Sequence, residues 1–349
     1  MRILLVDSTL YAPSNPLFLE ALQELSVERG FEYNFVDEAP FLRPLSASFI
    51  HKVAFRLLGR RPLTYWALNR KLLVEVRRFR PDLVIIVQGA YFSFNTLSLI
   101  KEETGKVLIN YATDDPFHPN VSTRDLIKAI PIYDLYACTM RSILDPVSKA
   151  GCRMTIYVPF GYKPTIHYPE KPSNSDEKAR FDADVAFVGT CDSARLPYLT
   201  AIIERIPNVR LAIYGGEAWK RYRILRRYYR GLALGREYRL ALGGAKIVLA
   251  FSRRAHHPGP LMRHFEIPAC AGFMLAERTE ECMELLKEDH EAVYFSCPEE
   301  LVDKVRYYLS RDDERQRIAE AGHRKVTLGG HTYKDRLIQI LEAVRALSG

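Results

Sequence analysis

The sequence predicts two α/β domains, each built on a mostly parallel sheet. Over residues 1–165, short apolar runs alternate with turn signals and amphipathic stretches, a pattern typical of alternating strands and helices. The same alternation begins again near Val185, after a stretch rich in proline, serine and charge. With 349 residues, the chain is long enough for two cores of ordinary size. We therefore expect two domains rather than one continuous sheet.

The first domain is expected to cover residues 1–165. Its apolar runs predict strands at residues 2–6, 33–36, 83–88, 107–111, 135–139 and 155–158. Helices are expected at residues 16–29, 47–58, 65–79, 95–103 and 141–150. This order is that of a doubly wound domain.

The second domain is expected at residues 166–330, and the linker that joins the two domains is placed within residues 159–182, so the two ranges overlap. Its predicted strands are residues 185–188, 210–214, 246–251 and 273–276, with a helix at 197–205. The helical spacing of Leu337, Ile340, Leu341 and Val344 predicts a final helix within residues 331–349, which we expect to cross back and pack on the first domain. Two such domains facing one another would place the carboxyl ends of their strands at a shared cleft.

Composition bounds the kind of protein. Hydrophobic residues make up 48% and charged residues 26%, which excludes a disordered chain. The run Leu83–Val87 is far too short to cross a bilayer, and the start lacks the apolar centre of a signal peptide. Six dispersed cysteines without a CxxC pair indicate a reducing compartment. We expect a cytoplasmic protein, with peripheral association at the inner face of the membrane left open.

The net charge of +8 favours acidic partners. Basic residues crowd one stretch of the first half and the segment RYRILRRYYR at 221–230; the first group is Lys52, Arg56, Arg60, Arg61, Arg70, Lys71, Arg77, Arg78 and Arg80. Both groups fit solvated helix faces, and both fit contact with an anionic membrane surface or acceptor. Nucleic acid is the third reading, and we expect no nucleic-acid partner.

The segment RHFEIPACAGFML, residues 263–275, is the most informative motif. It is followed by EAVYF at 291–295, a helix with paired tyrosines, and HTY with an arginine at 331–336. Together these resemble the CgeB-like (spore-maturation-type) glycosyltransferases over residues 183–341, while the first half shares little beyond architecture and a DDP at 114–116. The resemblance implies a GT-B fold, with two facing Rossmann-like domains, and retaining transfer of a sugar from a nucleoside-diphosphate-sugar donor.

The resemblance implies that Glu266 holds the donor ribose. An ionised carboxylate can accept charge-assisted hydrogen bonds from two vicinal hydroxyls. The alternative is a glutamate favoured at a helix start by the macrodipole. Arg263, one helical turn earlier, is expected to bind the diphosphate together with helix amides, and an ordinary surface arginine is the alternative.

Further donor contacts are expected in the turns after two strands. Gly189 and Thr190, with Arg195, match the FVGT and arginine of the resembled family; the glycine would allow close approach and the hydroxyl would meet phosphate. Gly215 and Gly216 are expected to leave room for the nucleobase, and Trp219 is interpreted as structural.

The catalytic candidates are Asp114, Asp115, His256 and His257. The aspartates follow a predicted strand, where they would act as a base on the acceptor or orient it, or would simply cap a turn. Retaining relatives often carry a second glutamate eight residues before the ribose ligand, and Pro258 occupies that place here. His256 and His257 could contact the sugar instead, or lie idle in their loop.

Asp114 and Asp115 are adjacent and do not form a DxD metal motif, so we expect a metal-independent reaction in which the nucleotide sugar is a co-substrate and no cofactor is needed. Pro268 predicts a kink or a late start in the helix that carries Glu266. Two rivals remain: a nucleotide-sugar epimerase of the same fold, and a binding or assembly protein without catalysis.

Overall fold

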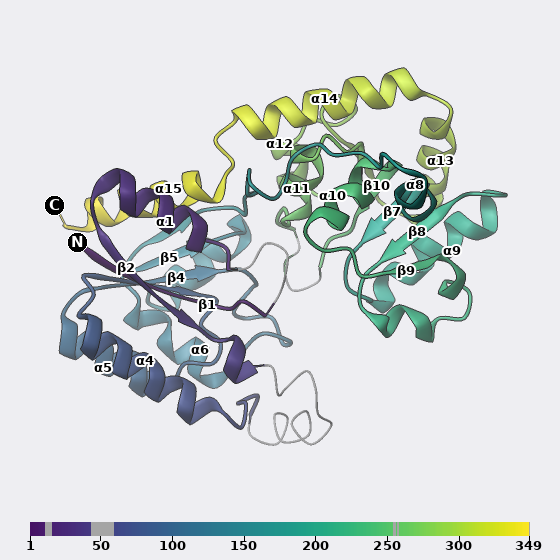
Figure 1. Ribbon diagram of the computed structural model, residues 1–349. Coiled ribbons are helices and arrows are strands. Elements are labelled where there is room, and N and C mark those ends of the chain that lie inside the picture. The colour runs from purple at the N-terminus through teal and green to yellow at the C-terminus, as the bar shows by residue number, and fades with distance from the viewer. Residues whose placement is uncertain (11–15, 43–58, 254–255, 257, 349) are drawn as a thin grey trace. The chain divides into compact units, whose positions relative to one another are not determined.

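The structure, a computed structural model, describes residues 1–10, 16–42, 59–253, 256 and 258–348. It divides into two compact units (Figure 1). Unit 1 comprises residues 1–160, 254–259 and 333–349, and unit 2 comprises residues 161–253 and 260–332. The helix expected at residues 47–58, with Lys52 and Arg56, and the candidate His257 lie outside the described residues.

Unit 1 is built on a parallel sheet of six strands in the order β2-β1-β3-β4-β5-β6. The strands are β1 (Arg2–Asp7), β2 (Glu32–Asp37), β3 (Leu83–Val87), β4 (Val107–Ala112), β5 (Leu135–Cys138) and β6 (Thr155–Tyr157). The chain reverses its direction of travel across the sheet between β1 and β3, which makes that pair the topological switch point of unit 1.

Helices cover both faces of this sheet (Figure 1). One face packs on α1 (Leu19–Arg29) and α15 (Tyr333–Ser348); the other packs on α4 (Tyr65–Phe79), α5 (Phe94–Thr104) and α6 (Arg124–Ala129). A short α7 (Leu144–Lys149) precedes β6. Leu4 and Val6 of β1 are fully buried in the same cluster as Leu68 and Leu72 of α4, as the two-residue period of a strand requires.

The final helix α15 belongs to unit 1 and packs beside α1. Lys334 forms ion pairs with Glu24, at 3.3 Å, and with Glu28. Arg336 is buried, and its Nε donates to the carbonyl oxygen of Phe160 at 3.1 Å. These contacts attach α15 to α1 and to the segment that ends at Phe160.

Unit 2 repeats the plan with a second parallel sheet, in the order β12-β11-β10-β7-β8-β9. The strands are β7 (Ala183–Val188), β8 (Leu211–Tyr214), β9 (Tyr229–Gly231), β10 (Ala245–Ala250), β11 (Met274–Glu277) and β12 (Val293–Phe295). The first strand, β7, lies in the middle, so the switch point falls between β7 and β10.

The helices of unit 2 are α8 (Ser175–Phe181), α9 (Leu196–Arg205), α10 (Arg236–Gly243), α11 (Arg263–Ala269), α12 (Glu280–Leu285), α13 (Pro298–Leu309) and α14 (Asp312–Leu328). One face of the sheet packs on α9 and α13, in a core that includes Phe187, Ile202 and Val305. The predicted α/β class with parallel sheets is confirmed in both halves.

Several elements differ from the sequence prediction. The segment expected to be a linker contains α8, whose start is capped by Asn174 and whose Glu177 binds Arg236 at 2.6 Å, so it is part of unit 2. The helix α11 begins at Arg263, and Pro268 lies in its last turn, where only one backbone bond is lost. The late helix start that Pro268 suggested does not occur.

Among the described residues, no helix combines the length and hydrophobicity needed to cross a bilayer. All six cysteines are described, and none is in a disulfide.

Candidate functional site

The carboxyl ends of β7 and β10 form the switch point of unit 2, where α/β sheets bind ligands. Gly189 and Thr190 follow β7 directly, and Arg195 ends the short 3-10 helix at Ser193–Arg195 that leads into α9. The Nη1 of Arg195 donates to the carbonyl oxygen of Thr190 at 2.5 Å and to its hydroxyl at 3.3 Å. Arg195 is thereby folded back onto the turn after β7.

Arg195 is unusual in its environment. Only 6% of the residue is exposed, and its guanidinium lies over the Phe187 ring at 5.1 Å from the centroid. Its Nε is buried and has no hydrogen-bond partner among the described residues. A buried guanidinium N–H without an acceptor is costly, which is why such groups are rare unless a ligand completes them.

Two more guanidinium groups act on Arg195. The pKa of Arg195 is lowered to about 10, mainly by burial and also by the charges of Arg253 and Arg263, against the opposing charge of Asp192. Arg263 is tied to the same strand end, because its Nε donates to the carbonyl of Val188, the last residue of β7, at 3.2 Å. Three cations therefore gather at the switch point, where a diphosphate would neutralise them.

The glycines of the two turns have different surroundings. A Cβ on Gly215 would lie 2.2 Å from the carbonyl oxygen of Gly189, and that oxygen accepts a hydrogen bond from Trp219 Nε1 at 3.1 Å. Gly215 thus allows the turns after β7 and β8 to touch, and the buried Trp219 holds them together, as its structural interpretation anticipated. Beside Gly216 there is open space within 4 Å. The nucleobase contact predicted for this pair finds room only at Gly216.

Glu266 lies on α11 with its side chain fully buried. Its Oε2 accepts a hydrogen bond from the Tyr238 hydroxyl at 2.8 Å and forms an ion pair with Arg263 Nη1. On the other side, Oε1 lies 3.5 Å from Nε2 of the buried His167. Burial, followed by other charges around it, lowers the pKa of His167 despite the nearby carboxylate, so this imidazole is neutral at pH 7.

Glu266 and Arg263 are therefore brought together, as the sequence suggested, but as a pair within the protein. The guanidinium of Arg263 also lies over the Tyr238 ring, 4.8 Å from its centroid. Because the carboxylate already meets protein donors, a ribose hydroxyl would have to replace one of them. In the structure described here, Glu266 orients Arg263 toward the end of β7.

In unit 1, the candidates lie near the carboxyl end of β4. Gln88, at the end of β3, accepts hydrogen bonds through Oε1 from the backbone N–H groups of Thr113 and Asp114, both at 2.9 Å. Asp115 caps its own turn, since its Oδ1 accepts from the N–H of Phe117 at 2.8 Å. The capping interpretation of the aspartates thus has direct support at Asp115.

His256 joins this group. Its ring is fully buried, lies 5.1 Å from the Phe160 ring, and places Nδ1 2.8 Å from the carbonyl oxygen of Thr113. Because a carbonyl only accepts, Nδ1 carries the proton. The backbone next to Asp114 is therefore fixed by His256 on one side and Gln88 on the other.

Sequence reasoning missed Arg253, Tyr238, His167 and Gln88. Arg253 could have been found, because it follows the strand at 246–251 at the edge where ligands bind. Gln88 was predicted as the end of a strand, although it has a positive φ of 59° and acts through its side chain. Tyr238 and His167 had no signal, since both lie more than 25 positions from Glu266.

Comparison with known families bears directly on the second half of the chain. Residues 195–342 match the model of a family described as glycosyl transferase-like. The carboxyl-terminal part of this chain is therefore similar to that family over the matched segment. The matched segment begins at Arg195 and includes Arg253, Arg263 and Glu266, so the three cations of the switch point lie within the region of similarity.

Solved structures share the fold of the entire chain. HepE of Anabaena, in complex with UDP-glucose, aligns with a TM-score of 0.69 at 15% identity, over 99% of this chain and 100% of that one. Sucrose-phosphate synthase of Thermosynechococcus elongatus aligns with a TM-score of 0.71 at 12% identity, over 99% of both chains. The chain thus shares the GT-B fold of these structures.

The same fold also occurs in a protein described as an epimerase. A putative UDP-N-acetylglucosamine 2-epimerase of Listeria monocytogenes aligns with a TM-score of 0.61 at 12% identity, over 99% of this chain and 96% of that one. No curated protein matches the chain by sequence.

Proposed function

We propose that this protein transfers a sugar from a nucleoside-diphosphate-sugar donor to a hydroxyl acceptor, and that unit 2 holds the donor at its switch point. The observation that carries the proposal is Arg195, whose buried Nε has no acceptor among the described residues and which lies beside the charges of Arg253 and Arg263. A diphosphate supplies acceptor oxygens and negative charge in one group. The glycosyl transferase-like match and the UDP-glucose complex of HepE support the same ligand class.

The cations would also serve the chemical step. When the bond between sugar and diphosphate breaks, negative charge grows on the departing nucleotide, and fixed cations stabilise that charge more than the ground state. Arg263 is fixed by Glu266 and by the carbonyl of Val188, which keeps it oriented before the donor arrives. Glu266 is therefore a positioning residue in our proposal, because it acts by orienting Arg263.

The ribose role of Glu266 stays a prediction. If a ribose hydroxyl replaces Tyr238 or Arg263 on the carboxylate, Glu266→Gln should weaken nucleotide binding by about 1–3 kcal/mol through loss of charge-assisted bonds. The change also leaves Arg263 without its counter-charge. Tyr238→Phe is therefore measured beside it, because this variant removes one hydrogen-bond donor to Glu266 and keeps the carboxylate.

On the acceptor side we propose that the turn at Asp114 and Asp115, fixed by Gln88 and His256, meets the incoming hydroxyl. Asp114 or Asp115 would take its proton or orient it. The acceptor is a glycan, a lipid-linked saccharide or a protein. The proposal includes retention of configuration and membership of the CgeB-like group, both on the resemblance of residues 263–275 and 291–295. It also includes independence from metal ions, because Asp114 and Asp115 do not form a DxD motif.

We also propose a cytoplasmic location. Six cysteines without a disulfide fit a reducing compartment, and two of them, Cys270 and Cys282, are buried in unit 2.

The decisive experiment mixes the full chain with a panel of nucleotide sugars and follows the products by mass spectrometry. Our proposal predicts release of a nucleoside diphosphate, with slow hydrolysis alone and faster release when an acceptor is present. Conversion of one nucleotide sugar into its epimer would favour the epimerase instead. Binding of a nucleotide without turnover, across a wide set of acceptors, would favour a non-catalytic protein.

A further inference from the structure

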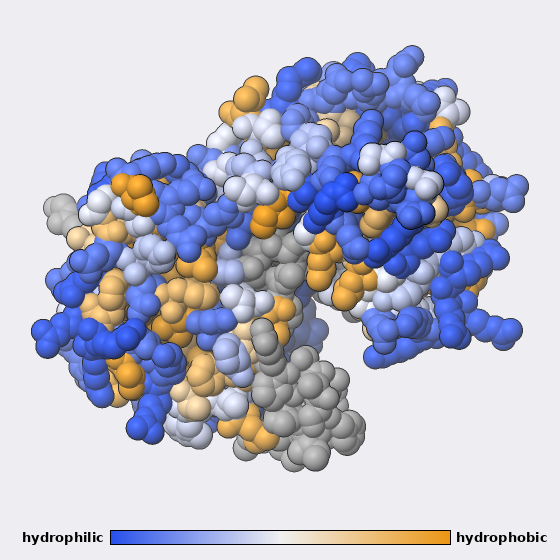
Figure 2. Space-filling model, viewed as in Figure 1, coloured by the Kyte–Doolittle hydropathy of each residue, from blue (hydrophilic) through white to orange (hydrophobic). Residues whose placement is uncertain are grey.

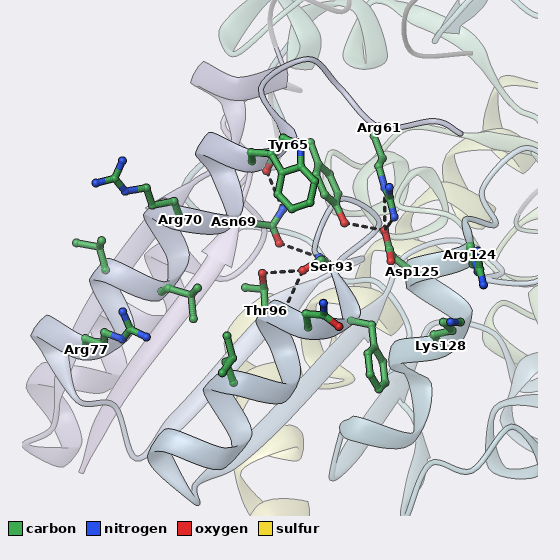
Figure 3. Close-up of a pocket in the computed structure, with 16 residues that line it drawn as sticks. Arg61, Tyr65, Asn69, Arg70, Arg77, Ser93, Thr96, Arg124, Asp125 and Lys128 are labelled. Carbon is green, nitrogen blue, oxygen red and sulfur yellow. Dashed lines mark hydrogen bonds and ion pairs between the residues drawn. The ribbon is translucent and has the colours of Figure 1, made fainter. Parts of the chain in front are cut away.

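A basic and apolar groove lies on the outer side of unit 1, between α4, α5 and α6 (Figure 3). It has a volume of about 680 Å³. Its walls come from side chains one or two helical turns apart, which places them on the same face of each helix. We call it the α4–α6 groove, and it is lined by Trp66, Arg70, Val74 and Arg77 of α4, Phe94, Asn95 and Leu99 of α5, and Arg124 and Lys128 of α6, among others.

The floor of the groove is polar and fully satisfied. Asn69 is buried, accepts a hydrogen bond from the N–H of Ser93 at 2.8 Å and donates to the carbonyl of Tyr91 at 3.0 Å. At one end, Asp125 is neutralised by Arg61 at 2.7 Å and accepts from the Tyr65 hydroxyl at 2.6 Å (Figure 3). The groove is therefore held in shape by bonds between helices, without a ligand.

The walls combine exposed apolar groups with cations. Trp66 is 72% exposed, and Val74, Leu99 and Phe94 are 48%, 40% and 38% exposed, which is high for residues so apolar. Figure 2 shows hydrophobic residues among hydrophilic ones over the part of unit 1 where α4 and α5 lie. Burying such side chains would stabilise contact with an apolar phase by about 25 cal/mol for each Å² removed from water.

The charge on the walls is positive and available. Arg70, Arg124 and Lys128 are exposed and form no ion pair with any residue that the structure describes, whereas Arg77 is paired with Glu103 at 2.5 Å. In Figure 3, Arg70 and Arg77 project on the α4 side, and Arg124 and Lys128 on the α6 side. The cations thus flank the apolar strip on both sides.

We propose that the α4–α6 groove docks unit 1 on an anionic lipid bilayer. Apolar and aromatic side chains flanked by arginine and lysine fit the boundary between headgroups and acyl chains, where the rings enter the apolar layer and the cations meet lipid phosphates. A nucleic-acid surface would use the cations but leave Val74 and Leu99 in water. The bilayer accounts for both kinds of side chain.

This inference stands apart from the donor site, because the groove belongs to unit 1 and the switch point to unit 2. It also gives a role to the amino-terminal basic stretch, because some of its cations line the α4–α6 groove. Of that stretch, Arg60, Arg61, Arg70, Lys71, Arg77, Arg78 and Arg80 are described, and four of these, Arg61, Lys71, Arg77 and Arg78, pair with carboxylates of their own unit.

The chain carries its own reporter for the test. It has two tryptophans, of which Trp66 lines the groove and Trp219 is fully buried in unit 2. On addition of vesicles of phosphatidylcholine with phosphatidylglycerol, emission should shift to the blue as Trp66 leaves water. Vesicles of phosphatidylcholine alone should cause a much smaller shift, and added salt should reverse the effect. Trp66→Phe should still sediment with the anionic vesicles while the shift disappears.

Two charge variants make a matched pair. Arg124→Gln with Lys128→Gln removes two groove cations, and Arg226→Gln with Arg227→Gln removes two cations from unit 2, so both lower the net charge equally. The groove variant should bind vesicles about thirtyfold more weakly, which corresponds to ~1 kcal/mol for each basic residue near an anionic surface. The unit 2 variant should bind within a few-fold of the wild type.

Equal losses in the two charge variants would overturn the proposal, because the attraction would then be a property of net charge. Absence of vesicle binding at low salt would overturn it as well, and so would tight binding to an oligonucleotide in its place. Thermal melts confirm that the variants are folded. Nucleotide binding by the groove variant should stay at the wild-type level, so failure here and failure of the donor site are distinguishable.

Discussion

Replacing Glu38 with glutamine should remove a large pH dependence from the stability of unit 1. Glu38 follows β2, the residue is 6% exposed, and its Oε1 is buried without a hydrogen-bond partner among the residues that the structure describes. Asp7 and Asp37 lie nearby and already accept backbone N–H groups, from Ser8 at 2.7 Å and from Ala39 at 2.8 Å respectively. Burial first, and then the charges of both aspartates, raises the pKa of Glu38 to about 8.

The sign follows from proton binding. Between pH 5 and pH 8 the folded state keeps a proton that an unfolded glutamate, with a pKa of 4.5, has mostly released. Stability therefore falls as the pH rises through this window. At ~1.36 kcal/mol for each pH unit, the free energy of unfolding should drop by about 3.5 kcal/mol between pH 5 and pH 8.

The assay is urea unfolding followed by circular dichroism at pH 5 and at pH 8. Glutamine has the shape of a protonated glutamate and stays neutral at both pH values. The free energy of unfolding of Glu38→Gln, relative to that of the wild type, should therefore rise by about 3.5 kcal/mol between pH 5 and pH 8. Glu102→Gln, at an exposed position of α5, controls for the loss of one carboxylate. If the difference between wild type and Glu38→Gln is the same at both pH values, the protonated state of Glu38 is refuted.

Two further changes test the structure around the donor site. Gly215→Ala should destabilise unit 2 by about 1–3 kcal/mol, because its Cβ would fall 2.2 Å from the carbonyl of Gly189, while Gly216→Ala, with open space within 4 Å, should melt like the wild type. Similar melting temperatures for the two alanine variants would contradict the packing described for these turns. Tyr238→Phe should cost about 1.5–3 kcal/mol in urea unfolding, because Glu266 loses a hydrogen bond of 2.8 Å in a buried site. An unchanged unfolding curve would show that this hydroxyl contributes nothing to holding the carboxylate.

The alternation of strands and helices could be predicted because it is written in local periodicity. The strand β1 was located to within a residue because its apolar residues form one unbroken run, and the helix α4 because its apolar residues recur at helical spacing. Short elements were missed: β9 has three residues, and α8 is mostly charged, with one buried residue, Phe181. Neither carries enough apolar residues to show a period.

The candidate site was predictable where a sequence motif sufficed. Gly189, Arg195 and Arg263 were chosen because they match motifs of the resembled family, and the structure brings them together at the end of β7. What the sequence could not indicate is which protein groups occupy a side chain. Glu266, predicted to bind a ribose, is enclosed by residues from α10 and from the segment before α8, far away in sequence, and these contacts had no signal in the sequence.

The central claim is that a nucleoside diphosphate binds at the switch point of unit 2, and calorimetric titration tests it most directly. UDP, GDP, ADP, CDP and dTDP would be titrated into the wild type, Arg195→Gln and Arg205→Gln. The two arginines stand at the two ends of α9, and Arg205 makes only a surface pair with Glu299 at 3.2 Å. We predict that the wild type binds at least one of the nucleotides, that Arg205→Gln binds it equally well, and that Arg195→Gln binds it about 10- to 100-fold more weakly, as the loss of ~1.5–3 kcal/mol requires. Equal affinity of folded Arg195→Gln and wild type, or no binding of any of these nucleotides to the wild type, would contradict the account.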